Sequence, residues 1–440
     1  MQDYITVIGG GLSGCEAAYQ IAKRGIKVKL YEMKPNKFSP AHSNENLAEI
    51  VCSNSFKSNS ITNACGLLKE ELRRLDSLLI KCADNTSVPA GQALAVDREV
   101  FSKFVTDEIE KNKNIQIIRQ EYKSDIENEE GIVIIATGPL TSEELSRQIG
   151  QITGDDKLYF YDAASPIVEK DSIDMSIAFW GDRYGKGDSS YINLPMNKEE
   201  YENFYNALVK AEVVTLHEFE KKEIFEGCMP VEIMAKRGID TLRFGPLKPV
   251  GFTDPRTDKR PYAIVQLRQD NKEGTIFNMV GFQTNLKFPE QKRVFSMIPG
   301  LKNAEFAKYG VMHRNTYINS SKLLDETYNL KSNPNIFFAG QITGVEGYVE
   351  SISSGMIAGI NAANKFLNKD KFILPEETVI GSLAKYISTP NDKFQPMNAN
   401  FGILPSLEEN IKDKKIRYEK LSRESIGNNF FTSIISNLLI

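Results

Sequence analysis

The hydrophobic positions near the N-terminus follow two different periods. Residues 4–8, YITVI, form a short β-branched run that ends in glycines and predicts a strand. Residues 13–23 carry apolar side chains at helical spacing, and residues 27–31 have the pattern of a second strand. Strand, helix and strand in this order predict one βαβ unit with parallel strands.

Two later apolar runs end at glycines in the same way. Residues 132–136 are followed by Thr137 and Gly138, and residues 336–339 are followed by Gly340. The second run leads through a segment rich in glycine and serine into a predicted helix. We therefore expect both runs to be strands of the same parallel sheet, ending at the edge where such sheets bind their ligands.

The stretch between these runs has a different texture. Residues 263–267 and 276–280 have the pattern of strands, and prolines mark the joints between segments. These prolines are Pro195, Pro230, Pro246, Pro249 and Pro255. We interpret residues 189–310 as an inserted α+β domain that faces the substrate. Residues 1–188 and 311–440 then form one discontinuous α/β domain.

The composition is that of a globular protein large enough for two or three domains. Of the 440 residues, 41% are hydrophobic and 25% are charged. No run of about 18 apolar residues is present, and Met1 leads directly into a predicted strand rather than into a signal segment. We therefore predict a cytoplasmic protein without a membrane partner.

The cysteines and histidines do not have the spacing of a metal site. Five cysteines without a CxxC pair do not suggest a disulfide framework, and the three histidines are scattered. These residues are Cys15, Cys52, Cys65, Cys82, Cys228, His42, His217 and His313. The sequence predicts free thiols and no bound metal.

Positive charge is concentrated in one part of an otherwise acidic chain. The formal net charge is -4, which argues against general polyanion binding, yet residues 221–293 hold 14 Lys and Arg against 9 Asp and Glu. Contact with phosphates is one interpretation of this stretch. An ordinary solvated face is the other.

The segment GGGLSG, which begins at Gly9, fits the pattern GxGxxG of dinucleotide-binding loops. Gly9 permits the tight turn, Gly11 lets the backbone approach a pyrophosphate, and Gly14 lets helix and strand pack closely. Gly10 is also predicted to bind the cofactor. The helix N-terminus then faces the phosphates. The second strand ends at Glu32, a suitable acceptor for ribose hydroxyls.

A late segment favours FAD over NAD as the dinucleotide. FFAGQITGVEGYVESISSGMIAGINAA, which contains Gly340, Gln341 and Tyr348, resembles the second flavin-contacting strand and helix of glutathione-reductase-type flavoproteins. The expected fold is therefore a glutathione-reductase-type FAD-binding Rossmann domain with an inserted α+β domain. Tyr348 could stack on a flat ligand or pack in the core.

One thiol lies in a segment with the features of a loop. Gly227 precedes Cys228, Pro230 follows it, and Lys236 and Arg237 would lower its pKa if the fold brought them near. A reactive thiol and a buried core cysteine both remain open on this pattern.

Cys52 and His313 are the other two candidates. Cys52 lies among small and polar residues in AEIVCSNSFKS, and His313 lies in GVMHRNTYINS. A core cysteine remains the alternative for Cys52. His313 could equally cap a strand or contact a ligand.

Taken together, the motifs resemble one family, the folate- and FAD-dependent RNA uracil-5-methyltransferases. The resemblance covers nearly the whole chain. It is carried by GGGLSGCEAA, AEIVCSNSFKSN, GLLKEELRRLDS, PAGQALAVDR, ATGPLTS, YFYDAASPIV, FEGCMPVEIMAKRG, TLRFGPLKPVG, VQLRQDN, VGFQTNLK, EQKRVFSMIPGL, YGVMHRNTYINS and FFAGQITGVEGYVES. Many long matches in the same order make it specific.

This resemblance implies a reaction in which FAD carries carbon. The methylene of 5,10-methylenetetrahydrofolate would pass through reduced FAD to C5 of a uridine in RNA, with NADPH or NADH as the reductant. It implies that Cys228 adds to uracil C6. It implies for Cys52 either removal of the C5 proton or protection of the methylated flavin. His313 would hold the folate, and residues 221–293 would meet RNA phosphates.

The RNA target and two other functions remain open. The family is known chiefly for the T-loop of tRNA, but Gln92 and Leu194 depart from its pattern, so uridine of 23S ribosomal RNA is the alternative target. A related flavoprotein that installs aminomethyl groups on wobble uridines is longer and needs a GTPase partner. A plain NAD(P)H-dependent flavin oxidoreductase would have no RNA role.

Overall fold

The structure is a computed structural model of the chain. It describes residues 3–154, 158–185, 190–214, 229–392, 394–409 and 411–427, and for residues 158–162, 313 and 314 it describes the backbone alone. None of the described helices is long and apolar enough to cross a membrane.

A five-stranded parallel sheet forms the centre of the larger unit. Its order is β16-β7-β1-β2-β6, and every neighbouring pair is parallel. The strands are β1 (Tyr4–Ile8), β2 (Lys27–Tyr31), β6 (Ile115–Ile118), β7 (Val133–Ile135) and β16 (Ile336–Phe338). The four strands expected in this sheet are confirmed, whereas β6 was not expected.

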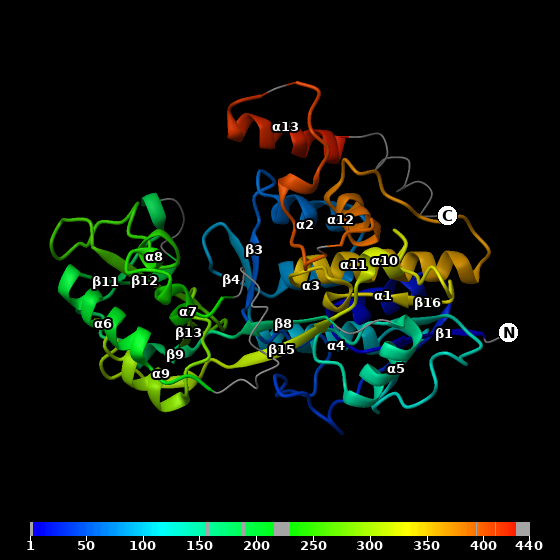
Figure 1. Cartoon of the computed structure of the whole chain (residues 1–440), viewed down its shortest axis with the longest axis horizontal. Helices are drawn as coiled ribbons and strands as arrows, with labels where there is room; N and C mark the ends of the chain where they lie inside the picture. The colour runs from blue at the N-terminus through cyan, green and yellow to red at the C-terminus, as the bar shows by residue number, and fades with distance from the viewer. Residues whose placement is uncertain are drawn as a thin grey trace.

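Two helices pack against each other over this sheet, as Figure 1 shows: α1 (Leu12–Ala22) and α11 (Tyr348–Phe366). Their axes approach closely because a Cβ added at Gly355 or Gly359 would meet the backbone of Ser13 or Ala17. The surrounding helices are α2 (Ala64–Arg74), α3 (Leu78–Asn85), α4 (Arg98–Glu110), α5 (Glu143–Thr153), α10 (Ser320–Leu323), α12 (Val379–Ser388) and α13 (Lys414–Gly427).

A second unit with its own core lies on the left of Figure 1. Its antiparallel sheet has the order β10-β11-β12-β13-β9-β14. The strands are β9 (Ile167–Glu169), β10 (Phe179–Trp180), β11 (Tyr191–Met196), β12 (Ala263–Gln269), β13 (Ile276–Met279) and β14 (Phe306–Lys308). Its helices are α6 (Lys198–Lys210), α7 (Val231–Lys236), α8 (Thr241–Phe244) and α9 (Phe288–Phe295).

The strands of this second sheet lie on both sides of residue 189, where the sequence predicts the insert to begin. β9 and β10 precede that residue, because β9 pairs with β13 and β14, and β10 pairs with β11. The sheet therefore does not divide the chain at residue 189, and the division of the chain into domains stays a prediction.

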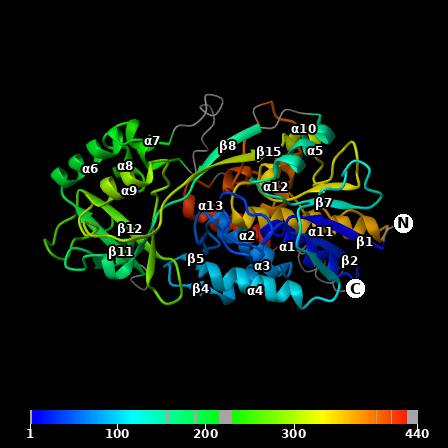
Figure 2. The ribbon, with the colours of Figure 1, turned by 90° about the horizontal axis from the view of Figure 1, so that it is seen from below.

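Smaller elements connect the two units. The antiparallel pair β8 (Leu158–Ala163) and β15 (Met312–Tyr317) runs between them, as Figure 2 shows from below. A three-stranded sheet, β3-β5-β4, consists of β3 (Ser55–Ser58), β4 (Ser87–Val88) and β5 (Ala93–Val96). Short 3-10 turns lie at η1 (Lys170–Ser172), η2 (Arg183–Gly185), η5 (Gln341–Thr343) and η6 (Phe401–Ile403).

Candidate active site

The glycine loop joins β1 to α1 in the conformation that the sequence predicts. Gly9 has φ +106°, a value that side chains disfavour. A Cβ at Gly14 would strike the carbonyl oxygen of Gly9, so α1 packs directly on the turn. A Cβ at Gly11 would meet no protein atom within 4 Å, which leaves open space at the N-terminus of α1.

Glu32 stands at the end of β2 beside this loop. Its Oε2 accepts a hydrogen bond from the backbone N–H of Gly10 at 3.0 Å, and its Oε1 accepts one from the N–H of Lys34 at 2.9 Å. These bonds fix the carboxylate, and each oxygen retains a lone pair for a ribose hydroxyl.

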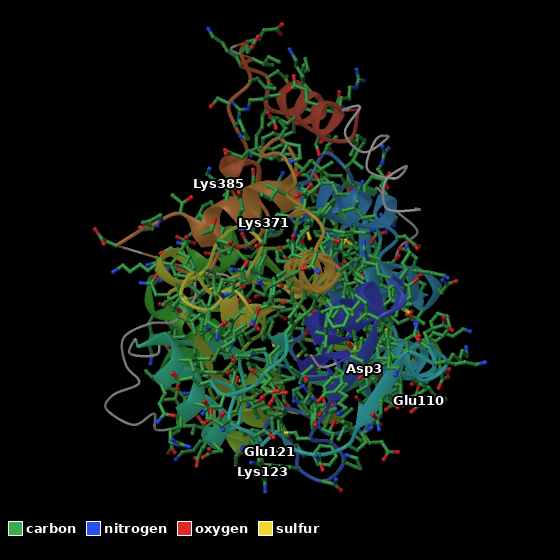
Figure 3. All side chains as sticks on the ribbon, turned by 90° about the vertical axis from the view of Figure 1, so that its right-hand side faces the viewer. Asp3, Glu110, Glu121, Lys123, Lys371 and Lys385 are labelled. Atoms are coloured by element: carbon green, nitrogen blue, oxygen red, sulfur yellow. The ribbon has the colours of Figure 1, made fainter. Side chains whose placement is uncertain are left out.

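The loop and Glu32 line one cavity with residues from distant parts of the chain. Its walls include Gly9, Gly10, Gly11, Glu32, His42, Cys52, Glu121, Thr137, Gly138, Asn315, Gln341 and Tyr348. In Figure 3, Glu121 lies low in the view, below Lys371 and Lys385. Gly9, Glu32 and Thr137 follow the ends of β1, β2 and β7. The cavity thus follows the carboxyl edge of the parallel sheet, where such folds bind ligands.

Gly340 and Gln341 lie between β16 and α11. Gly340 has φ +86°, and its N–H donates to Ser354 Oγ at 2.7 Å, which ties the turn to α11. Gln341 lines the cavity, and its Nε2 donates to Glu346 Oε2 at 2.5 Å. Gly340 shapes the turn that carries Gln341, and its contact with the cofactor stays a prediction.

Tyr348, the first residue of α11, contacts the Cys52 segment. Its hydroxyl oxygen accepts hydrogen bonds from the backbone N–H groups of Cys52 at 3.0 Å and Ser53 at 3.1 Å. Its ring packs on Phe56, with 5.6 Å between centroids. The tyrosine therefore both packs in the core and lines the cavity, where the two were alternatives on the sequence.

The remaining described cysteines are core residues. Cys15, Cys65 and Cys82 are at most 2% exposed, whereas Cys52 is partly exposed. Burial raises the pKa of the Cys65 thiol to about 11 and that of Cys82 to about 12. Burial likewise raises the pKa of Cys15. These three thiols are protonated and inert at neutral pH.

Two of the predicted site residues are described incompletely. Cys228 lies outside the described residues. His313 lies in β15, and its side chain also lies outside the described part of the chain. Asn315, two residues further along the same strand, lines the cavity. The roles of Cys228 and His313 stay predictions.

Sequence reasoning missed an ion pair in the cavity wall. Lys34 Nζ lies 3.1 Å from Glu49 Oε2, and the two side chains are only 4% and 8% exposed. The carboxylate of Glu49 also accepts N–H groups of Ser43 and Asn44, so it shapes the chain before Cys52. In the sequence both residues resemble ordinary surface charges, and no local signal distinguishes them.

The residues present fit the ADP half of a dinucleotide cofactor. Gly11 leaves space that a side chain would fill, the N-terminus of α1 faces that space, and Glu32 is held beside it. Among the described residues, no three His, Cys, Asp or Glu side chains gather as metal ligands do.

Comparison with known proteins agrees with this geometry. The model of a family described as glucose inhibited division protein A matches residues 4–370. A protein of Acetivibrio thermocellus named methylenetetrahydrofolate--tRNA-(uracil-5-)-methyltransferase TrmFO is 64% identical over 96% of this chain and 97% of its own. A Fusobacterium nucleatum protein of the same name is 60% identical over 97% of this chain and 98% of its own.

The solved structure of Aquifex aeolicus GidA in its form II crystal superposes with a TM-score of 0.70. The two are 18% identical, and the match covers 99% of this chain and 75% of that one. This likeness confirms the α/β fold of Rossmann type that the sequence predicts.

Proposed function

This chain belongs to the TrmFO family within the GidA-type proteins, and we propose on that premise that it methylates C5 of a uridine in the T-loop of tRNA. The carbon comes from 5,10-methylenetetrahydrofolate, and NADPH or NADH supplies the electrons in the cytoplasm. One observation carries the proposal: the dinucleotide loop and the Cys52 segment line the same cavity.

We assign the cofactor to residues of this cavity. Gly9, Gly10 and Gly11 hold the pyrophosphate of FAD, and Glu32 holds the ribose. Gln341 and Tyr348 face its flavin end. When bound, FAD supplies redox chemistry and the means of carrying one carbon.

The two thiols act on the uracil ring. Cys228, as a thiolate, adds to C6, which places an electron pair on C5 and makes that carbon nucleophilic. After C5 has accepted the carbon, Cys52 removes the C5 proton. The electron pair of that C–H bond forms the C5–C6 double bond, and the bond between C6 and Cys228 breaks to release the thiolate. Reduction of the transferred carbon to a methyl group would take two electrons, which NADPH or NADH would supply through bound FAD. His313 holds the folate in this scheme.

Basic residues of the second unit contact the RNA. The stretch 221–293 carries 14 Lys and Arg against 9 Asp and Glu, and these cations meet the phosphates while the target base turns out of its stack. The names of the relatives specify tRNA, so the 23S ribosomal RNA alternative gains no support. Identity of 64% with a protein named TrmFO, over nearly the whole of both chains, favours methylation over the wobble-uridine function.

The test is methyl transfer by the purified protein. Label from the folate methylene should appear in 5-methyluridine of a tRNA transcript, with either NADPH or NADH, and not in a 23S ribosomal RNA fragment. Cys228→Ala should abolish the transfer. Cys82→Ala, which alters a buried thiol of α3 that does not line the cavity, is the matched control and should retain it.

Three outcomes would contradict the proposal. Full transfer by Cys228→Ala would remove that residue from its role. Label in the ribosomal fragment alone would change the target. NAD(P)H oxidation with no label in RNA and no salt-sensitive RNA binding would favour the plain flavin oxidoreductase.

A further inference from the structure

A side chain of the second unit reaches the segment that carries Cys52. Arg268 lies near the end of β12 and is 7% exposed. Its Nε donates to Asn54 Oδ1 at 3.0 Å, and its Nη2 donates to Ser53 Oγ at 2.7 Å. Both acceptors belong to the residues that immediately follow Cys52, so the guanidinium is hydrogen-bonded to the loop next to the thiol.

Arg268 is an unusual residue to bury for stability alone. Its two loop acceptors are neutral, and burial lowers the pKa of the guanidinium even though Tyr191 and the Asp270 carboxylate favour its charged form. Taking a charge out of water costs free energy, and a hydrophobic side chain of similar volume often stabilises such a site as well or better. What the guanidinium provides is a planar group with several donors in a rigid arrangement, which fixes two acceptors at once.

Neighbouring bonds hold the same loop from the same strand end. Asn54 Nδ2 donates to the carbonyl oxygen of Gln269 at 2.9 Å. On the other side of Cys52, Arg98 Nη1 donates to the carbonyl oxygen of Val51 at 2.9 Å, and its Nε lies 3.0 Å from Asp270 Oδ2. The end of β12 therefore contacts the chain on both sides of the thiol, directly or through Arg98.

We propose that Arg268 is a positioning residue: it fixes the Cys52 loop relative to the second unit and so sets where the thiol stands in the cavity. Arg268 does not need to touch the substrate. The inference rests on the proposed function for its catalytic consequence but not for its structural one.

The structural consequence is tested by alkylating the full-length holoenzyme with iodoacetamide and measuring each cysteine-containing peptide by mass spectrometry. In Arg268→Met the rate at Cys52 should rise at least fivefold, because the loop loses two bonds and opens. Arg268→Lys keeps one donor group and should give an intermediate rate. Cys15, Cys65 and Cys82 should stay unlabelled, which shows that the variant is folded.

Arg24→Met is the matched control. Arg24 is partly buried, burial lowers its pKa to about 10, and its Nη1 donates to the neutral carbonyl oxygen of Gln20 at 2.7 Å. It lies beyond the end of α1 and makes no bond to the Cys52 loop. In Arg24→Met, the rate of alkylation at Cys52 should equal that of the wild type.

The catalytic consequence is a split between kinetic constants. Arg268→Met should lower kcat for tRNA methylation at least tenfold, while KM for tRNA changes less than twofold. An unchanged Cys52 alkylation rate with the three buried thiols protected would overturn the proposal. If Arg268→Met exposes those thiols, Asn54→Leu and Ser53→Ala decide instead, since each removes one of the two acceptors of Arg268, although Ser53→Ala also removes the acceptor of the Ser55 N–H. Each should raise the Cys52 rate at least twofold, and an unchanged rate in both would overturn the proposal.

The experiments distinguish failure of the proposed function from failure of the positioning role of Arg268. A wild-type holoenzyme that transfers no methyl group would contradict the proposed function, yet the alkylation rates would still decide whether Arg268 holds the loop. Normal methylation with unchanged alkylation in Arg268→Met would contradict only the positioning role.

Discussion

The hydroxyl of Tyr348 and the backbone of Cys52 are joined by a hydrogen bond of 3.0 Å, although the two residues lie 296 positions apart in the chain. The same oxygen accepts the N–H of Ser53. The first residue of α11 thereby fixes the backbone that presents the thiol to the cavity.

Removing this hydroxyl should slow the reaction with little effect on folding. In Tyr348→Phe the ring still packs on Phe56, but the N–H groups of Cys52 and Ser53 lose an acceptor. A positioning loss of about 1.4 kcal/mol corresponds to about a tenfold lower kcat. Single-turnover methylation measures it. Tyr386→Phe, which removes a hydroxyl bonded to the Gln395 carbonyl oxygen, should keep the wild-type rate, and equal rates for both variants would contradict the prediction.

Substitutions at two glycines of the same loop should have different effects, one on stability and one on cofactor binding. Gly14→Ala places a methyl group against the backbone oxygen of Gly9, so the fold should lose about 1–3 kcal/mol in its free energy of unfolding. Gly11→Ala meets open space, so its stability should stay near that of the wild type while the methyl group hinders the pyrophosphate. Denaturant unfolding and FAD content separate the two effects. A stable Gly11→Ala protein with full FAD content would show that the phosphates lie elsewhere.

The buried carboxyl of Glu71 should make stability depend on pH. Glu71 bonds to the N–H groups of Val379 and Ile380 and to Ser425 Oγ, and burial raises its pKa to about 7. The unfolded value is about 4.3. Between these values the native state binds more protons than the unfolded state, so the stabilisation is complete below about pH 4.3 and is lost as pH rises through 7.

The measurement is the difference in unfolding free energy between the wild type and Glu71→Gln across that range. From pH 4.5 to 7.5, the unfolding free energy of the wild type should fall by about 3 kcal/mol relative to that of Glu71→Gln. Glu70→Gln, which alters the neighbouring, partly exposed residue, should show no such trend. A flat difference for Glu71→Gln would mean that the native carboxyl titrates as it does in the unfolded chain.

Removing one partner of the ion pair between Lys34 and Glu49 should lower the free energy of unfolding more than replacing both partners with apolar residues. Lys34→Met leaves a carboxylate without its buried partner, so we expect a loss of about 3–5 kcal/mol. The double variant Lys34→Met/Glu49→Leu removes both charges and should recover most of that loss. Urea unfolding gives the three values, and a double variant no more stable than Lys34→Met would contradict the expected coupling.

Much of the larger unit could be predicted because its elements are local. The period of 4–8 and 13–23 gave the strand and helix, and the glycines between them specified the turn. β6 was not predicted, because its four residues include the exposed Gln116 and form too short a pattern. The sheet of the second unit was harder to delimit, since β9 joins it only by pairing with strands more than 100 residues later.

The sequence by itself determined the cofactor loop, the thiol candidates and the family, because each depends on residue types at short, fixed spacing. Only the tertiary structure decided which of these residues meet. Cys52 stands beside Tyr348 because α11 crosses α1 at two glycines, and Arg268 reaches the same loop because two units pack together. Bonds between residues hundreds of positions apart leave no periodic trace in the chain, so packing alone could reveal them.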